Sequence, residues 1–132
     1  MTRRNISSGV PWEKTVGYSR AVRIGNLIEV AGTTAVDDTG AVIGLDDPYR
    51  QAKYALEKIG RALGEAGAGF GDVIRTRIFV TDITRWEEVG RAHGEVFSDV
   101  HPASTLVQVA SLVRADLLVE IEATAVVREG SL

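Results

Sequence analysis

The chain has 132 residues, of which 45% are hydrophobic and 25% are charged, and its net charge is −3. These values are typical of a soluble globular protein and argue against a general nucleic-acid binder, which usually has a basic excess. The absence of cysteine excludes disulfides, a thiol nucleophile and a cysteine-rich zinc site.

The length favours a single domain over residues 1–132. Arg3 and Arg4 lead into a polar segment without the apolar stretch of a secretory signal. No apolar run approaches the roughly 20 residues that a membrane helix needs. We therefore expect a cytoplasmic protein with no membrane association.

The first part of the chain predicts short strands. Residues 1–16 have little periodicity, and we expect an arm that only the rest of the fold can order. Two short runs, Tyr18 to Ile24 and Leu27 to Ala31, flank Gly25-Asn26 and predict a β-hairpin. A short third strand is expected at Ala41 to Ile43.

Two helices are expected in the middle of the chain, on either side of a strand. The first runs from Asp47, a capping residue followed by Pro48, to Ala66. A strand follows from Asp72 to Thr81. The form Thr84-x-x-Glu87 resembles a capping box and predicts a second helix to about Phe97.

The last part of the chain predicts two strands, Ser104 to Val109 and then a long one from Leu117 to Val127. The long strand alternates strictly, with an apolar face opposite a face that includes Glu120 and Glu122. We expect this strand to be central, and its carboxylates to be on a rigid element suited to acid or base chemistry.

The order of elements predicts an α+β fold, a mixed sheet with two helices on one face. The other face should include Glu120 and Glu122 together with Thr76, Ile78 and Val80 or the alternate residues of that strand. Such a face is too apolar for water and too charged for the core of a monomer. An oligomer that stacks these faces would explain both properties.

Several short segments, in their order and spacing, resemble the RidA/YjgF family of reactive intermediate deaminases, also called L-PSP endoribonuclease-like proteins. The resemblance extends over nearly the whole chain. The segments are Tyr18, Ile24-Gly25-Asn26-Leu27-Ile28, Ala31-Gly32, Asp72-Val73-Ile74-Arg75-Thr76, Phe79-Val80-Thr81-Asp82, Pro102-Ala103 and Val119-Glu120-Ile121-Glu122-Ala123.

The resemblance implies a chorismate-mutase-like fold, a homotrimer with clefts between subunits, and hydrolysis of an imine or enamine to a 2-oxo acid and ammonia. The glutamate that helps to activate water falls on Glu120. The arginine that clamps the substrate carboxylate falls on Ser104, which has neither its charge nor its fork geometry. The chain therefore resembles an arginine-lacking subgroup. Tyr18, Gly32, Ser104, Thr105 and Leu106 are the implied substrate-binding positions.

Structural roles compete with these assignments. Glu122 is expected to pair across strands with Arg75 or Arg77, and Glu120 has the same alternative. His93 is expected to be a packed histidine with one hydrogen bond. Arg20 could replace the missing cation, but a solvated strand arginine is the simpler interpretation.

We expect neither a metal nor another cofactor. The two histidines lack a neighbouring carboxylate at ligand spacing. The glycines at 67, 69 and 71 stand between a helix and a strand, the wrong order for a dinucleotide loop.

Three functions remain open. The first is a trimeric hydrolase or deaminase acting on a C=N bond, with Glu120 catalytic and a small-molecule substrate other than a simple 2-imino acid. The second is a trimer that binds a small metabolite without turnover, because a fold can persist after its chemistry changes. The third, a ribonuclease, is disfavoured by the acidic charge.

Overall fold

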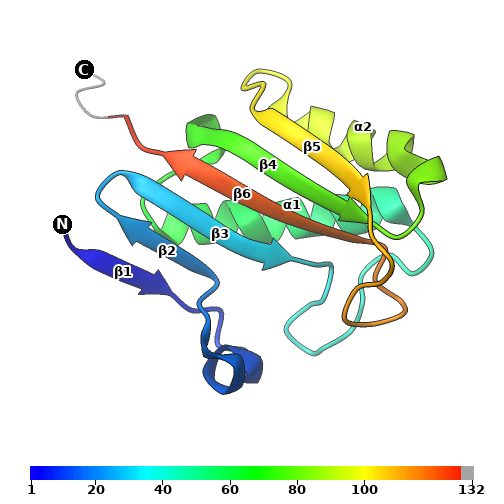
Figure 1. Cartoon of the computed structure of the whole chain (residues 1–132), viewed down its shortest axis with the longest axis horizontal. Coiled ribbons are helices and arrows are strands. Elements are labelled where there is room, and N and C mark those ends of the chain that lie inside the picture. Colours follow the sequence, from blue (N-terminus) through cyan, green and yellow to red (C-terminus); the bar gives the residue numbers. More distant parts are fainter. Residues whose placement is uncertain (129–132) are drawn as a thin grey trace.

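The computed structural model describes residues 1–128, which form a six-stranded mixed sheet with two helices on one face (Figure 1). In the order in which they lie side by side, the strands are β1 (Arg3–Ile6), β2 (Ala21–Ile24), β3 (Leu27–Thr33), β6 (Val119–Val126), β4 (Val73–Val80) and β5 (Ala103–Gln108), and all neighbours are antiparallel except β4 and β5. The expected α+β class is confirmed, and the last four residues of the expected 1–132 domain lie outside the described residues. The helices are α1 (Pro48–Glu65) and α2 (Trp86–Phe97). Short helical turns lie at Glu13–Gly17, Phe70–Asp72 and Ile83–Arg85.

Strand β6 lies between β3 and β4, as its alternation predicted. Its apolar face is buried against the helices, whereas Glu120, Glu122 and Thr124 on the other face remain half-exposed. Helix α1 supplies much of the opposing core through Leu56, Ile59 and other buried residues. The core therefore fills the space between one face of the sheet and the helices.

Helix α1 begins as its sequence predicted. The Asp47 carboxylate accepts a hydrogen bond from the backbone N–H of Arg50 at 3.0 Å, and Pro48 occupies the first turn. Gly67 follows the helix with φ +85°, a left-handed conformation that suits glycine at a helix end. No helix among residues 1–128 is long and apolar enough to cross a membrane.

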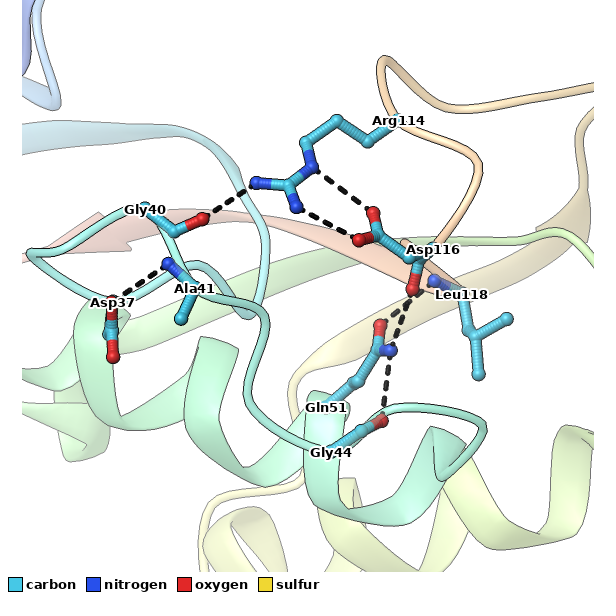
Figure 2. Close-up of polar contacts among 8 residues, drawn as sticks. All are labelled: Asp37, Gly40, Ala41, Gly44, Gln51, Arg114, Asp116 and Leu118. Carbon is cyan, nitrogen blue, oxygen red and sulfur yellow. Dashed lines mark hydrogen bonds and ion pairs between the residues drawn. The ribbon is translucent and has the colours of Figure 1, made fainter.

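Gln51, fully buried on α1, ties two loops to the start of the helix (Figure 2). Its Nε2 donates to the carbonyls of Gly44 and Asp116, both at 3.0 Å, and its Oε1 accepts from the Leu118 N–H at 2.8 Å. Arg114 adds a bidentate contact to Asp116. The entry into β6 is thereby fixed relative to α1.

The expectations for the N-terminal segments need two corrections. Part of the expected arm is a strand, since β1 pairs antiparallel with β2 along the sheet edge. The expected strand at Ala41 to Ile43 is wrong, and only one bridge joins Val36 and Val42. The reason is local, because Asp37 Oδ1 accepts hydrogen bonds from the backbone N–H groups of Thr39 and Ala41 and closes a turn.

The expected capping box before α2 is also wrong. Asp82, not Thr84, is the capping residue, since its carboxylate accepts from the N–H and hydroxyl of Thr84. A short helical turn intervenes, and α2 begins at Trp86 with no side-chain cap.

The parity of β4 is resolved by the structure. Thr76, Ile78 and Val80 face the helices and are buried. Their alternates, Arg77 and Phe79, are therefore the β4 residues on the uncovered face, beside Glu122 and Glu120 respectively.

Candidate functional site

Glu120 and Gly32 meet where β3 and β6 run side by side. The pairing of these strands is irregular between Val30 and Thr33, so Gly32 lies in a bulge. A side-chain carbon at Gly32 would overlap Glu120 Oε2 and would lie 3.0 Å from its Cδ. The absence of a side chain at position 32 is therefore what lets the Glu120 carboxylate lie against the β3 backbone.

Arg20 joins this pair from the start of β2. Its Nη2 donates to the Gly32 carbonyl at 2.6 Å, and its guanidinium lies 5.9 Å from the centre of the Tyr18 ring. Its Nε is buried, with no hydrogen-bond partner within the described chain. Tyr18, Arg20, Gly32 and Glu120 thus form one group, which we call the Glu120 group.

The electrostatics of Glu120 differ from those of its neighbour on the strand. Burial raises the pKa of Glu120, the charge of Glu122 raises it further, and Arg20 opposes both effects. No residue among 1–128 donates a hydrogen bond to the Glu120 carboxylate. Glu122 instead faces Arg77 across the strands, with Oε1 and Nη1 3.8 Å apart. The expected cross-strand role is confirmed for Glu122, and Glu120 forms no such ion pair among the described residues.

A broad hollow of about 730 Å³ lies on the uncovered face of the sheet, over β1, β2 and β3. Tyr18 and Ala31 line it, and it extends to Arg77 and Glu122. Glu120 and Gly32 are adjacent to the hollow but are not part of its lining. Its lining includes several charged side chains, among them Arg3, Glu13 and Glu29.

The predicted residues on β5 lie elsewhere. Thr105 is on the uncovered face, where its Oγ1 accepts from Arg75 Nη2 at 2.7 Å. Ser104 and Leu106 point to the opposite side of the sheet, toward α2. Leu106 packs on the core, whereas Ser104 is exposed at the sheet edge.

Ser104 belongs to a second group that the sequence did not indicate. Its Oγ lies 2.8 Å from Thr76 Oγ1, which lies 2.8 Å from His93 Nε2. The expected hydrogen-bonded packing of His93 is thus confirmed, but its connection to Ser104 through Thr76 was missed. The only signals were a threonine on the buried parity of β4 and a histidine on the inner side of α2.

The structure therefore places Gly32 against Glu120, connects Tyr18 to them through Arg20, and leaves Ser104, Thr105 and Leu106 apart from them. Arg20, which the sequence left as a lesser candidate, belongs with Glu120. Within residues 1–128 there is no cluster of three or more His, Cys, Asp or Glu side chains suited to a metal ion.

Comparison with known proteins gives concordant matches. Residues 11–127 match the sequence profile of the endoribonuclease L-PSP family. The crystal structure of Rv2704 from Mycobacterium tuberculosis, described as a member of the YjgF/YER057c/UK114 family, superposes with a TM-score of 0.87 at 50% identity, covering 96% of this chain and 100% of that one.

Two relatives in other bacteria are similar in sequence. The uncharacterized protein SCO2049 of Streptomyces coelicolor is 40% identical over 122 residues, 92% of this chain and 90% of that protein. The 3-aminoacrylate deaminase RutC of Acinetobacter baylyi is 32% identical over 108 residues, 82% of this chain and 85% of that protein.

Proposed function

Because the chain belongs to the endoribonuclease L-PSP family, the RidA/YjgF proteins, we propose that it hydrolyses a C=N bond of a small imine, or of an enamine after tautomerisation. The observation that supports this most is the Glu120 carboxylate, half-buried beside the Gly32 backbone with no hydrogen-bond donor among residues 1–128. The name of the RutC relative, 3-aminoacrylate deaminase, supports deamination as the type of reaction.

In the proposed reaction Glu120 moves protons to and from water. Glu120 accepts a proton as the water oxygen bonds to the imine carbon, and the imine nitrogen takes up a proton from solvent. The carbinolamine then collapses: Glu120 returns its proton to the nitrogen as the C–N bond breaks, and the hydroxyl proton passes to solvent as the C=O bond forms. Imine and water give a carbonyl compound and ammonia. Burial raises the pKa of the Glu120 carboxyl, so it holds a proton more readily than an exposed carboxyl would, which suits the return of that proton to the leaving nitrogen.

We further propose that the working site lies between copies of the chain, most simply in a trimer. Glu120 faces the uncovered side of the sheet, and Ser104 faces the helix side. One chain cannot direct both side chains at one small molecule. A neighbouring copy can supply the second group, and stacking of the uncovered faces would also bury the large hollow.

The substrate is proposed to differ from a simple 2-imino acid. The resemblance to the family implies that Ser104 stands where other members have a carboxylate-binding arginine. A hydroxyl offers one hydrogen bond and no charge, whereas a guanidinium offers two parallel hydrogen bonds and a positive charge. We therefore propose that the chain belongs to an arginine-lacking subgroup.

The experiment measures ammonia release from freshly generated imines, with the spontaneous rate subtracted. An amino-acid oxidase supplies 2-imino acids, and an amine oxidase supplies imines that lack a carboxylate. We expect the protein to accelerate hydrolysis of the imines that lack a carboxylate more than hydrolysis of the 2-imino acids. Glu120→Gln should reduce the catalysed rate by roughly 10²- to 10⁴-fold.

Glu122→Gln is the matched comparison, because Glu122 lies on the same face of the same strand. Removing its charge takes away one cause of the raised Glu120 pKa but leaves the Glu120 carboxylate in place, so the rate loss should be far smaller than that of Glu120→Gln. Full activity in Glu120→Gln, or no acceleration of any imine, would contradict the proposal. Ser104→Arg should raise the rate of ammonia release from 2-imino acids relative to the rate from the other imines.

A trimeric binding protein without turnover is the second candidate, and Ser104 is the observation that favours it. Saturable binding of a 2-oxo acid or an amine by calorimetry, with no ammonia released from any imine, would support this function over catalysis.

A further inference from the structure

Three side chains from three elements form a continuous hydrogen-bonded chain to the surface. His93 on α2 contacts Thr76 on β4, and Thr76 contacts Ser104 on β5, with both distances 2.8 Å. Thr76 is fully buried, and Ser104 is exposed at the edge strand. The chain thus runs from the half-buried His93 ring, through the fully buried Thr76 hydroxyl, to a hydroxyl that a ligand can reach.

The donors in this chain have one consistent direction. The Thr76 hydroxyl has a single proton, which it donates to Ser104 Oγ. In this arrangement the Thr76 oxygen accepts from His93, which corresponds to the tautomer with the proton on Nε2; the reverse arrangement would have Ser104 donating inward and the His93 proton on Nδ1. With its oxygen already accepting from Thr76, Ser104 keeps its own proton free to donate outward.

The His93 ring is held in the orientation that this requires. It packs on Phe97, with ring centres 4.6 Å apart, and burial lowers its pKa, which favours the neutral ring with one N–H. Because Thr76 stands between them, His93 does not touch Ser104. Thr76 and His93 are therefore positioning residues, and Ser104 is the residue that meets the ligand.

We propose that the His93–Thr76–Ser104 chain presents the Ser104 hydroxyl as an oriented donor that binds a neutral carbonyl oxygen of the substrate, such as that of an amide or ketone. This inference rests on the proposed function, since it places Ser104 in the substrate cleft. It extends that function by naming the chemical group recognised. A single neutral donor matches a carbonyl oxygen, while a carboxylate would remain without its counter-charge. Leu106, two residues along the same face, presents an apolar surface beside it.

Binding of two product-like probes tests the proposal without requiring turnover. Isothermal calorimetry compares 2-oxobutanamide with 2-oxobutyrate. The amide should bind more tightly than the acid. Ser104→Ala and Thr76→Val should each weaken binding of the amide about five- to tenfold, which is the contribution of one hydrogen bond. Neither should change binding of the acid.

The double variant should bind the amide no more weakly than either single variant, because each single substitution already disrupts the same hydrogen-bonded chain. Thr76→Ser should restore amide binding, which a purely structural role of the Thr76 methyl group would not allow. Ser104→Ala changes an exposed side chain, so this test holds even if Thr76→Val does not fold.

The direction of the chain has its own measurement. The protein has two histidines, so ¹⁵N NMR with His101→Gln assigns the His93 signals. We expect the neutral tautomer with the proton on Nε2. A proton on Nδ1, or equal binding of amide and acid that Ser104→Ala does not alter, would overturn the inference.

The two proposals fail separately. If no imine is hydrolysed in any assay but the amide still binds more tightly than the acid, catalysis is refuted and this inference is not. Hydrolysis that depends on Glu120 but not on Ser104 or Thr76 would refute only the inference.

Discussion

The most direct test of the Glu120 group is Gly32→Ala. The new methyl group would overlap Glu120 Oε2 and lie 3.0 Å from Cδ and 3.3 Å from Cγ. These atoms are at the end of a flexible side chain, so rotation of Glu120 can relieve the overlap while the backbone stays in place. We therefore expect the fold to survive and the carboxylate to leave its position.

The expected magnitudes separate activity from stability. An off-rotamer Glu120 costs about 0.5–1.5 kcal/mol, and replacing glycine restricts the unfolded chain by about 0.4–1 kcal/mol in the opposite sense. The net change in the free energy of unfolding should stay within about 1 kcal/mol. Imine hydrolysis should fall toward the level of Glu120→Gln, a loss of roughly 10²- to 10⁴-fold.

Urea unfolding and ammonia release measure the two effects on the same protein. Gly64→Ala is the control, because Gly64 lies within α1 with open space around its Cα, and alanine there should stabilise the helix by about 0.5–1 kcal/mol without loss of activity. Wild-type hydrolysis by Gly32→Ala would refute the role of this close approach. A stability loss above about 3 kcal/mol would show that the backbone moved instead.

Three further predictions concern stability. Gln51→Leu should lower the free energy of unfolding in urea by about 2–5 kcal/mol, because the Leu118 N–H and two carbonyls lose their partner. A decrease below about 1 kcal/mol would contradict the role of Gln51 in fixing β6 relative to α1. Asp47→Ala should cost about 1 kcal/mol by thermal or urea unfolding, whereas Asp47→Asn should keep most of the cap. Burial raises the Glu120 pKa above 4.5, so the native state binds this proton more tightly than the unfolded state, and the stabilising contribution is lost as pH rises through the raised pKa. Glu120→Gln should therefore exceed the wild type in stability at pH 7, with a gap that closes toward pH 4; a wild type that is more stable at pH 7 would be the opposite result.

Local patterns in the sequence predicted the central part of the fold. The alternation of β6 identified its buried face, and Asp47 with Pro48 identified the start of α1, because these signals depend only on neighbouring residues. Strand β1 gave no such signal, since only Ile6 of its four residues is buried. Its structure comes from pairing with β2, which no local pattern encodes.

The site was predicted only in part for the same reason. Tyr18, Gly32 and Glu120 were identified through resemblance; Gly32 does lie against Glu120, and Arg20 connects Tyr18 to them. The contact of Ser104 with Thr76 depends on the register of the parallel strands β4 and β5. Because α2 connects those strands, no turn fixes their register, and the sequence alone could not have paired the two hydroxyls.

Strand parity explains why the two groups stay apart within one chain. Glu120 pairs with Phe79 and Ser104 pairs with Thr76, and directly paired residues share a face of the sheet. Phe79 and Thr76 are three positions apart on the regular part of β4, an odd separation, so they face opposite sides. No side-chain rotation can reverse this, because only a one-residue register shift would, and such a shift would expose the buried face. If both groups act on one substrate, as proposed, they must come from different copies. A variant that prevents assembly would then abolish hydrolysis while leaving the pKa of Glu120 and the hydrogen bonds of Ser104 intact in each separate chain.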